Sequence, residues 1–401
     1  MAKLLREVPP TAGLPLSWSD FLPSGASLEN DMAVFLRQPE ALIEGSGTAA
    51  LIVALTTLKR RSSRHCVVIP AYTCPLVALA VAHCGLKPVL CDTRRNHFDF
   101  CPESLAAVCG EDTLAVVPTH LGGRVADLSI AMDIARTVGA YVVEDAAQSL
   151  GANWYGQPVG SIGDMGFYSL GVGKGLTIYG GGVVVARDGD LRRQLRLTSA
   201  EIASYRMVRE FRQLLELIGY FVLYRPSGLR IAYGLPLRRR LRKGQLIEAV
   251  GDDCRLDIPQ HRVGAWRKTI GANALKRLPA FLETTAAQAL RRKSLLASIP
   301  GVVVMDDAVG HAGTWPFLQV LMPTRQIRDN ALARLWHEGL GVGRLFIHAL
   351  PDYRYLAPLL GNTDTPNARD FAARMLTISN SPWLDEDDFM HICSILEKQT
   401  G

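Results

Sequence analysis

Short apolar runs and helical patterns alternate along the first half of the chain. Four apolar runs, each short enough for a strand, cover residues 66–70, 88–91, 113–118 and 141–143. The segments around them have the length and composition of helices, at residues 28–37, 49–59, 76–84 and 130–138. Strands that alternate with helices predict a mostly parallel, doubly wound sheet, so the expected fold class is α/β.

The second half of the chain predicts a smaller domain. Residues 317–322 and 375–384 predict strand regions, and residues 327–338 and 385–397 predict helices. Residues 1–23 are rich in proline and predict an N-terminal arm. We therefore expect a large domain over residues 1–256, arm included, and a smaller α+β domain over residues 257–401.

The 201–250 segment differs from the rest of the chain. Apolar residues at helical spacing predict a helix over 202–224 with one apolar face, formed by Val208, Phe211, Leu215, Ile218 and Val222. Residues 225–243 then carry seven basic residues and no acid. The favoured interpretation is a solvated insertion, or a rim that attracts anionic substrates. The alternative is a peripheral contact with anionic lipids or lipid-linked intermediates.

Composition narrows the class of protein. Of 401 residues, 48% are apolar and 20% are charged, which is typical of a packed soluble enzyme. The basic segment alone accounts for the net charge of +6, so the charge does not indicate nucleic-acid binding. The longest apolar run, residues 217–224, is too short to span a bilayer, and residues 1–6 lack the apolar segment of a secretory signal. We expect a cytoplasmic protein.

The cysteines do not predict a metal site. Six of the eight lie between Cys66 and Cys109, and none forms a Cys-x-x-Cys motif. Zinc sites usually have such paired ligands, so no metal is expected. Buried free thiols are the expected state.

The residues with the clearest catalytic potential lie between residues 141 and 183. An apolar strand ends in Glu144 and Asp145, and Lys174 follows among the glycines 171, 173 and 175. A carboxylate at the end of a strand lies where open α/β sheets bind ligands. A lone lysine among glycines is either a solvated loop residue or a reactive amine. Pyridoxal phosphate chemistry needs a lysine for the Schiff base and an acid against the pyridine nitrogen, and this stretch supplies both.

Three linked motifs resemble the DegT/StrS-type nucleotide-sugar aminotransferases. These are Val142-Val143-Glu144-Asp145-Ala146-Ala147-Gln148, Gly160-Ser161-Ile162-Gly163-Asp164, and Ser169 five places before Lys174. The resemblance covers roughly residues 28–200 and 257–397. It implies the aspartate aminotransferase fold, type I of the pyridoxal-phosphate enzymes, with a seven-stranded sheet in the large domain.

The resemblance also implies a cofactor site. Lys174 and Asp145 would be the catalytic pair, and Gln148 would contact the ring hydroxyl. Ser46-Gly47-Thr48 opens a predicted helix, which by itself is either an anion site or an ordinary cap. The resemblance favours a phosphate site there, shared with Ser169. Where the family has an aromatic residue flat on the ring, this chain has Cys74, so either the thiol contacts the ring or Tyr72 moves over it.

The resemblance also suggests residues that would contact the substrate, but these matches are looser than those of the cofactor site. His120, at a predicted strand end, is either a ring or substrate contact or a structural histidine, with equal support for both. Arg262, in Gln260-His261-Arg262-Val263, matches the family's arginine near the dimer interface, and His348 matches its histidine after a glycine turn. Arg369 replaces a family acid. The family's asparagine that reaches the phosphate from the neighbouring subunit has no clear counterpart.

These features predict an aminotransferase. It would use pyridoxal 5′-phosphate to move an amino group, from glutamate, onto a nucleotide-linked keto-sugar in polysaccharide or glycoconjugate biosynthesis. A homodimer follows by resemblance. Two alternatives are a sugar dehydratase of the same family, which Lys174 argues against because those enzymes carry histidine there, and a catalytically silent homologue that serves in binding or assembly.

Overall fold

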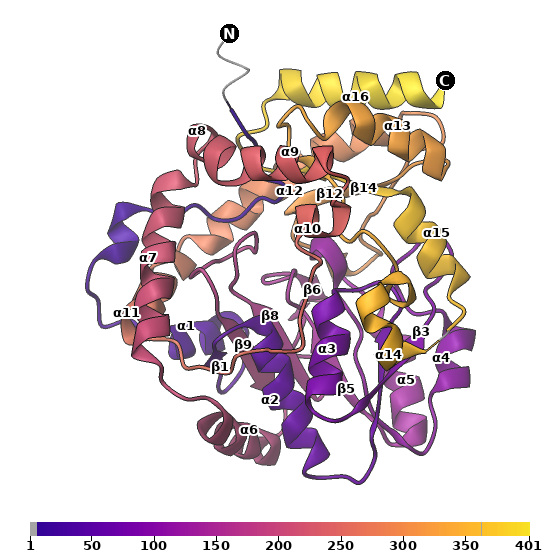
Figure 1. Cartoon of the computed structure of the whole chain (residues 1–401). Coiled ribbons are helices and arrows are strands. Elements are labelled where there is room, and N and C mark those ends of the chain that lie inside the picture. Colours follow the sequence, from indigo (N-terminus) through magenta and orange to yellow (C-terminus); the bar gives the residue numbers. More distant parts are fainter. Residues whose placement is uncertain (1–5, 362) are drawn as a thin grey trace.

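The computed structural model describes residues 6–361 and 363–401, so the first five residues of the predicted arm lie outside it. Its centre is a seven-stranded sheet in which four neighbouring pairs are parallel and β9 alone runs against both neighbours (Figure 1). Across the sheet, the strands are β1 (Leu42–Glu44), β9 (Gly182–Ala186), β8 (Met165–Ser169), β5 (Tyr141–Asp145), β4 (Thr113–Val116), β2 (Cys66–Pro70) and β3 (Lys87–Cys91). The predicted α/β class and mostly parallel sheet are confirmed.

Helices cover both faces of this sheet because alternate strand residues point to opposite sides. Val67 and Val184 join a core with α2 (Gly47–Lys59) and α3 (Pro75–His83), and α6 (Gly189–Ile202) packs on α2. On the other face, Val68 packs with α4 (Pro102–Val108) and α5 (Leu128–Val138). Val183 and Val185 pack there with α1 (Leu28–Phe35) and α11 (Ala265–Leu275).

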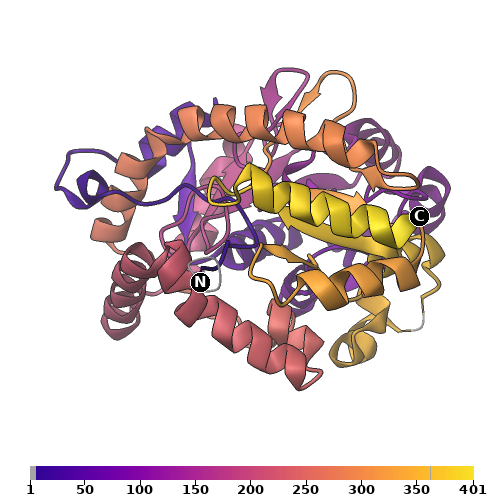
Figure 2. The same cartoon turned by 90° about the horizontal axis from the view of Figure 1, so that it is seen from above.

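A four-stranded antiparallel sheet forms the smaller α+β part. Its order is β10 (Val303–Val304), β12 (Phe317–Leu321), β14 (Met375–Ser379) and β13 (Val342–Gly343). Its helices are α12 (Leu278–Ala297), α13 (Arg325–Leu335), α14 (Ala357–Leu360), α15 (Pro366–Arg374) and α16 (Glu386–Thr400), with α12 and α16 side by side (Figure 2). A small sheet of β11 (His311–Ala312), β6 (Asn153–Trp154) and β7 (Gln157–Pro158) joins the two parts.

The 201–250 segment corrects one prediction. The helix expected over 202–224 is present as α7 (Met207–Leu223), but it begins five residues later because α6 runs to Ile202. The residues of the predicted apolar face, from Val208 to Val222, are between 37% and 85% exposed. Leu217, Tyr220 and Phe221 are buried instead. Periodicity indicated a helix here, but both sides of α7 carry apolar residues, so it did not indicate which side faces the core.

The rest of the segment is a series of short helices that connects α7 to α11. It consists of α8 (Pro226–Leu229), a π-helical turn (Arg230–Gly234), α9 (Leu235–Arg242) and α10 (Leu246–Val250), followed by an extended stretch (Figure 1). Asp252 ties that stretch to the smaller part, since its carboxylate accepts a 2.8 Å hydrogen bond from the Ile347 N–H. Arg238 of α9 donates to the buried Glu7 carboxylate at 2.7 Å.

The structure also bears on the expected lack of a membrane span and on the expected buried free thiols. Among the described residues, no helix combines the length and apolar character that a membrane crossing needs. All eight cysteines are free, as predicted, but only Cys91 and Cys393 are fully buried. The others lie near the ends of elements, where side chains are partly open to solvent.

Candidate active site

Lys174 and Asp145 line one pocket although they come from different segments. Asp145 ends β5, and Lys174 lies in the loop between β8 and β9. The pocket has a volume of about 220 Å³ and lies at the carboxyl ends of the parallel strands. All the predicted cofactor residues line it, namely Ser46, Gly47, Thr48, Cys74, Asp145, Gln148, Ser169 and Lys174.

Burial shifts the pKa of both catalytic candidates toward their neutral forms. It lowers the pKa of the Lys174 amine from 10.5, while Cys74 and Asp145 act in the opposite direction. It raises the pKa of the Asp145 carboxyl from 3.8, against a hydrogen bond from the Ala147 N–H and the nearby Lys174 and His120. A lysine whose pKa is lowered is a better nucleophile and proton carrier near neutral pH.

The Ser46-Gly47-Thr48 turn lines one end of the pocket at the start of α2. Ser46 caps α2 by accepting a 3.0 Å hydrogen bond from the Ala49 N–H. Gly47 packs closely on β8, because a Cβ added to it would lie 2.9 Å from the Ser169 Cβ. Two serine hydroxyls, one threonine and the first N–H groups of α2 therefore meet at one point. The donor set and the positive end of the helix suit a phosphate.

Glu144, the neighbour of Asp145, is a structural anchor on the opposite side of β5. It is fully buried and accepts hydrogen bonds from the N–H groups of Gly160, Ile162 and Gly163, each at 2.6 Å. His120 Nε2 lies 3.1 Å from the same carboxylate. Glu144 thus holds the 160–163 turn that leads into β8 and Ser169.

His120 lines the pocket with both ring nitrogens already engaged. Its Nδ1 accepts a 3.0 Å hydrogen bond from the Ala126 N–H, so Nε2 carries the proton toward Glu144. Of the two roles that the sequence left open, this geometry matches the structural one. Both ring nitrogens are therefore occupied by contacts within the protein.

The side of the pocket that lacks the family's aromatic residue contains Cys74 and Phe346. Burial raises the pKa of the Cys74 thiol to about 11, so it is protonated at neutral pH and acts as an apolar contact. Tyr72 does not line the pocket, since it is buried against Phe346 and Phe371. The sequence analysis missed Phe346, although it stands two residues before His348 where the family pattern has proline.

Three other predicted residues lie outside this pocket. Arg262 donates to the carbonyls of Ala203 and Ala200, both at 3.1 Å, at the end of α6. His348 is half-buried with its ring edge-on to Tyr353 at 5.3 Å. Arg369 pairs with Asp352 at 3.0 Å. The substrate roles expected for Arg262 and His348 stay predictions that this geometry does not support directly.

Arg267, which the sequence analysis did not single out, is fully buried beside the loop that follows Lys174. It donates to the carbonyl of Ile178 at 3.1 Å and to the Glu210 carboxylate at 2.7 and 2.6 Å. Its guanidinium therefore fixes α7 to the lysine-bearing loop. In the sequence, the only indication of this role is that Arg267 lies five residues after Arg262, which the family resemblance had singled out.

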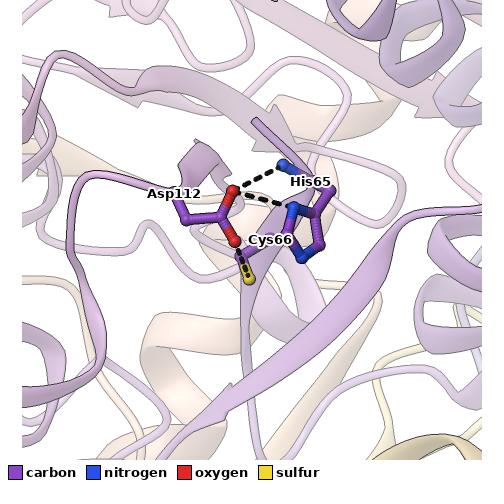
Figure 3. Close-up of side chains that lie close together, drawn as sticks. All are labelled: His65, Cys66 and Asp112. Carbon is purple, nitrogen blue, oxygen red and sulfur yellow. Dashed lines mark hydrogen bonds and ion pairs between the residues drawn. The ribbon is translucent and has the colours of Figure 1, made fainter. Parts of the chain in front are cut away.

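A separate polar cluster lies at the opposite end of the sheet. Asp112 accepts from the His65 N–H at 3.2 Å and from the Cys66 thiol at 3.1 Å, and the His65 ring lies 2.8 Å away (Figure 3). His65 and Asp112 directly precede the strands β2 and β4, and Cys66 is the first residue of β2, whereas the pocket lies at the other ends of these strands. Their side chains satisfy one another and have no part in the pocket.

The α/β fold thus places a lysine, a carboxylate and the turn at the start of α2 in one pocket. The model of the DegT/DnrJ/EryC1/StrS aminotransferase family matches residues 16–221 and 260–397. The chain belongs to this family. The unmatched stretch, residues 222–259, lies largely within the predicted insertion.

Named relatives match parts or most of the chain. The UDP-N-acetyl-3-dehydro-alpha-D-glucosamine 3-aminotransferase of Acidithiobacillus ferrooxidans is 36% identical over 43% of this chain and 47% of its own. The dTDP-3-amino-3,4,6-trideoxy-alpha-D-glucose transaminase of Streptomyces venezuelae is 26% identical over 92% and 85%. For the first relatives matched, the chain spans about half of their length.

Solved structures show the same fold. The pyridoxal-phosphate form of the putative sugar aminotransferase Spr1654 of Streptococcus pneumoniae superposes with a TM-score of 0.75. That match covers 98% of both chains at 17% identity.

Proposed function

We propose that this protein is a pyridoxal-phosphate-dependent aminotransferase that moves an amino group from glutamate onto a nucleotide-linked keto-sugar in glycan biosynthesis. The observation that carries the proposal is the position of Lys174 and Asp145 in one pocket, opposite the Ser46–Ser169 anion site. Family membership and the names of the relatives support it.

The pocket residues fit this cofactor, which supplies an aldehyde and an electron-withdrawing ring. Ser46, Gly47, Thr48 and Ser169 would hold its phosphate. Asp145 would accept a hydrogen bond from the protonated ring nitrogen, and that positive charge would return the buried carboxyl to its ionised form.

The remaining pocket residues orient the ring and move the proton. Gln148 already accepts a 2.7 Å hydrogen bond from the Gly122 N–H at its Oε1, so its amide nitrogen would donate to the ring oxygen. Cys74 and Phe346 would enclose the ring from one side. Lys174, the one amine that lines the described pocket, would bind the aldehyde carbon and then carry the substrate proton at Nζ.

The proposal includes a homodimer and a cytoplasmic location. Large apolar side chains remain exposed in the single chain, including Trp18 at 74% and Trp266 at 49%. A second copy would bury such surface, and shared active sites are expected in this family. Sedimentation velocity would test the dimer.

The decisive test of this function is a half-reaction. Protein loaded with pyridoxal phosphate is mixed with L-glutamate, and 2-oxoglutarate is quantified. About one equivalent per site is expected. A dehydratase or a silent homologue predicts that glutamate releases no keto acid from the loaded protein, and that result would overturn the proposal.

A further inference from the structure

A second cavity opens beside the cofactor pocket. It has a volume of about 690 Å³ and shares Lys174 and Gln148 with that pocket, so whatever fills it lies within reach of the reacting amine. One wall is the C-terminal half of α7, with Tyr220 and Tyr224 stacked at 4.5 Å between ring centroids. The opposite wall includes Phe317 and Pro316.

The cavity suits a sugar ring and does not suit a diphosphate. Aromatic and aliphatic side chains dominate its lining, and such faces pack against the C–H groups of a sugar. Among its described lining residues, Lys174 is the only cation, and Glu216 is the only anion. A diphosphate placed there would lack a counter-charge once Lys174 has bound the cofactor.

The cavity continues along α7 to an arginine-lined hollow. The hollow has a volume of about 490 Å³ and shares Glu216 with the cavity. Arg209, Arg212, Glu216 and Leu223 are spaced three, four and seven apart and lie on one face of the helix. At 1.5 Å per residue, Arg212 lies about 6 Å and Arg209 about 10 Å beyond Glu216 along the axis.

The arginines of this hollow bring positive charges close together, and few carboxylates pair with them. Arg206, Arg209 and Arg212 all line it. Among the described residues, Arg212 forms an ion pair with Glu216 alone, at 2.8 Å, and its side chain is 78% exposed, so water or a ligand anion readily replaces that contact. Arg209 is half-buried and, in the described part of the chain, donates to no carboxylate. Asp257 and Glu216 are the nearby acids.

We propose that Arg209 and Arg212, with Arg206 beside them, bind the diphosphate of a nucleoside-diphosphate sugar whose sugar ring occupies the tyrosine-lined cavity next to Lys174. Arg267 and Glu210 fix α7 in the register that aligns the two sites. The inference rests on the proposed function for its substrate class. It assigns the start of α7 as the specificity element of the acceptor site.

The test is nucleotide binding to the cofactor-loaded protein. Isothermal titration calorimetry with UDP, GDP, dTDP, ADP and CDP covers the five common bases, and each is compared with its monophosphate. We expect at least one diphosphate to bind more tightly than its monophosphate. Arg209→Gln and Arg212→Gln should each weaken that binding about tenfold or more, as expected for loss of a charge-assisted hydrogen bond.

The matched control is Arg239→Gln on the basic helix α9, outside both cavities, which should bind the nucleotide as the wild type does. An unchanged circular dichroism melting curve shows that the arginine variants are folded. Equal weakening in the α9 control, or no diphosphate bound by the wild type, would overturn the inference. Because no amine donor is present, this result is independent of whether glutamate discharges the cofactor.

Discussion

Glu210 on α7 and Arg267 on α11 form a two-point ion pair in the interior, with N···O distances of 2.7 and 2.6 Å. Arg267 is fully buried, and it also donates to the Ile178 carbonyl in the loop after Lys174. The pair therefore joins α7 to the loop that carries Lys174. Without it, α7 would expose its buried tyrosines to water.

Glu210→Gln should destabilise the protein by about 3–5 kcal/mol, because it leaves the buried guanidinium without its counter-charge. Urea denaturation measures this loss. Replacing both partners by methionine should recover part of the stability, since the unpaired charge is gone. Glu201→Gln, in an exposed pair with Arg60, should change the free energy of unfolding by less than about 1 kcal/mol. Equal losses in the two single variants would contradict this account of the buried pair.

Glu144→Gln should also destabilise the protein, for a different reason. The carboxylate accepts four hydrogen bonds, whereas a glutamine amide turns one acceptor into a donor that faces N–H groups. The cost is about 1–3 kcal/mol for each donor left without an acceptor. Thermal denaturation beside Glu283→Gln, an exposed position on α12, provides the comparison. A melting curve that matches the control would show that the 160–163 turn does not depend on Glu144.

Gly45→Ala should damage the anion-binding turn. An added Cβ would lie 2.6 Å from both the His261 ring and the His261 carbonyl, and the carbonyl cannot move aside. His261 is buried and its Nε2 lies 2.8 Å from Gln213 Oε1, so the clash should displace Ser46 instead. We expect at least about tenfold weaker retention of pyridoxal phosphate during dialysis, from overpacking of about 1–3 kcal/mol.

Gly110→Ala is the control for that substitution, because nothing lies within 4 Å of its added Cβ. It should retain the cofactor like the wild type. Retention by Gly45→Ala equal to that of Gly110→Ala would mean that the turn tolerates the methyl group and that its close packing is not needed for the phosphate.

The rate of cofactor capture should depend on pH through Lys174. Only the neutral amine attacks an aldehyde, and burial lowers the Lys174 pKa from 10.5, so the apo protein should capture pyridoxal phosphate with a midpoint below pH 10.5. The folded state disfavours the ammonium, so this group's contribution to stability falls as the pH falls. Asp145 raises the Lys174 pKa, and Asp145→Asn should therefore move the midpoint lower. Stopped-flow absorbance measures both, and an upward shift in the variant would contradict the assignment.

The catalytic core could be predicted from the sequence because its residues follow a local pattern. Asp145 was predicted from the short apolar strand that it ends, whereas Ser169 was predicted from the family motif, and the structure shows that it too ends a strand. The Ser46-Gly47-Thr48 turn could be predicted because serine and threonine cap helix starts through local hydrogen bonds, which do not depend on distant segments. Strand β2 was predicted residue for residue for the same reason.

The other features of the site depend on contacts between distant segments. Phe346 reaches the pocket from the smaller part of the chain, about which a single sequence gives no distance. His120 was ambiguous until its two nitrogens were found bonded to Ala126 and Glu144. The buried face of α7 could not be predicted, because apolar residues lie both on its buried side, as Leu217 and Phe221 do, and on its exposed side, as Val208 and Phe211 do.

The visible absorbance spectrum of the cofactor-loaded protein, with and without L-glutamate, tests the central role of Lys174 most directly. It is recorded beside Lys174→Ala and beside Lys268→Ala, a lysine that pairs with Glu29 away from the pocket. We predict a yellow band in the wild type and in the Lys268 variant that glutamate converts to the shorter-wavelength amine form of the cofactor, and no such band in Lys174→Ala. A Lys174→Ala spectrum identical to the wild type would contradict the account, as would a wild-type band that glutamate leaves unchanged.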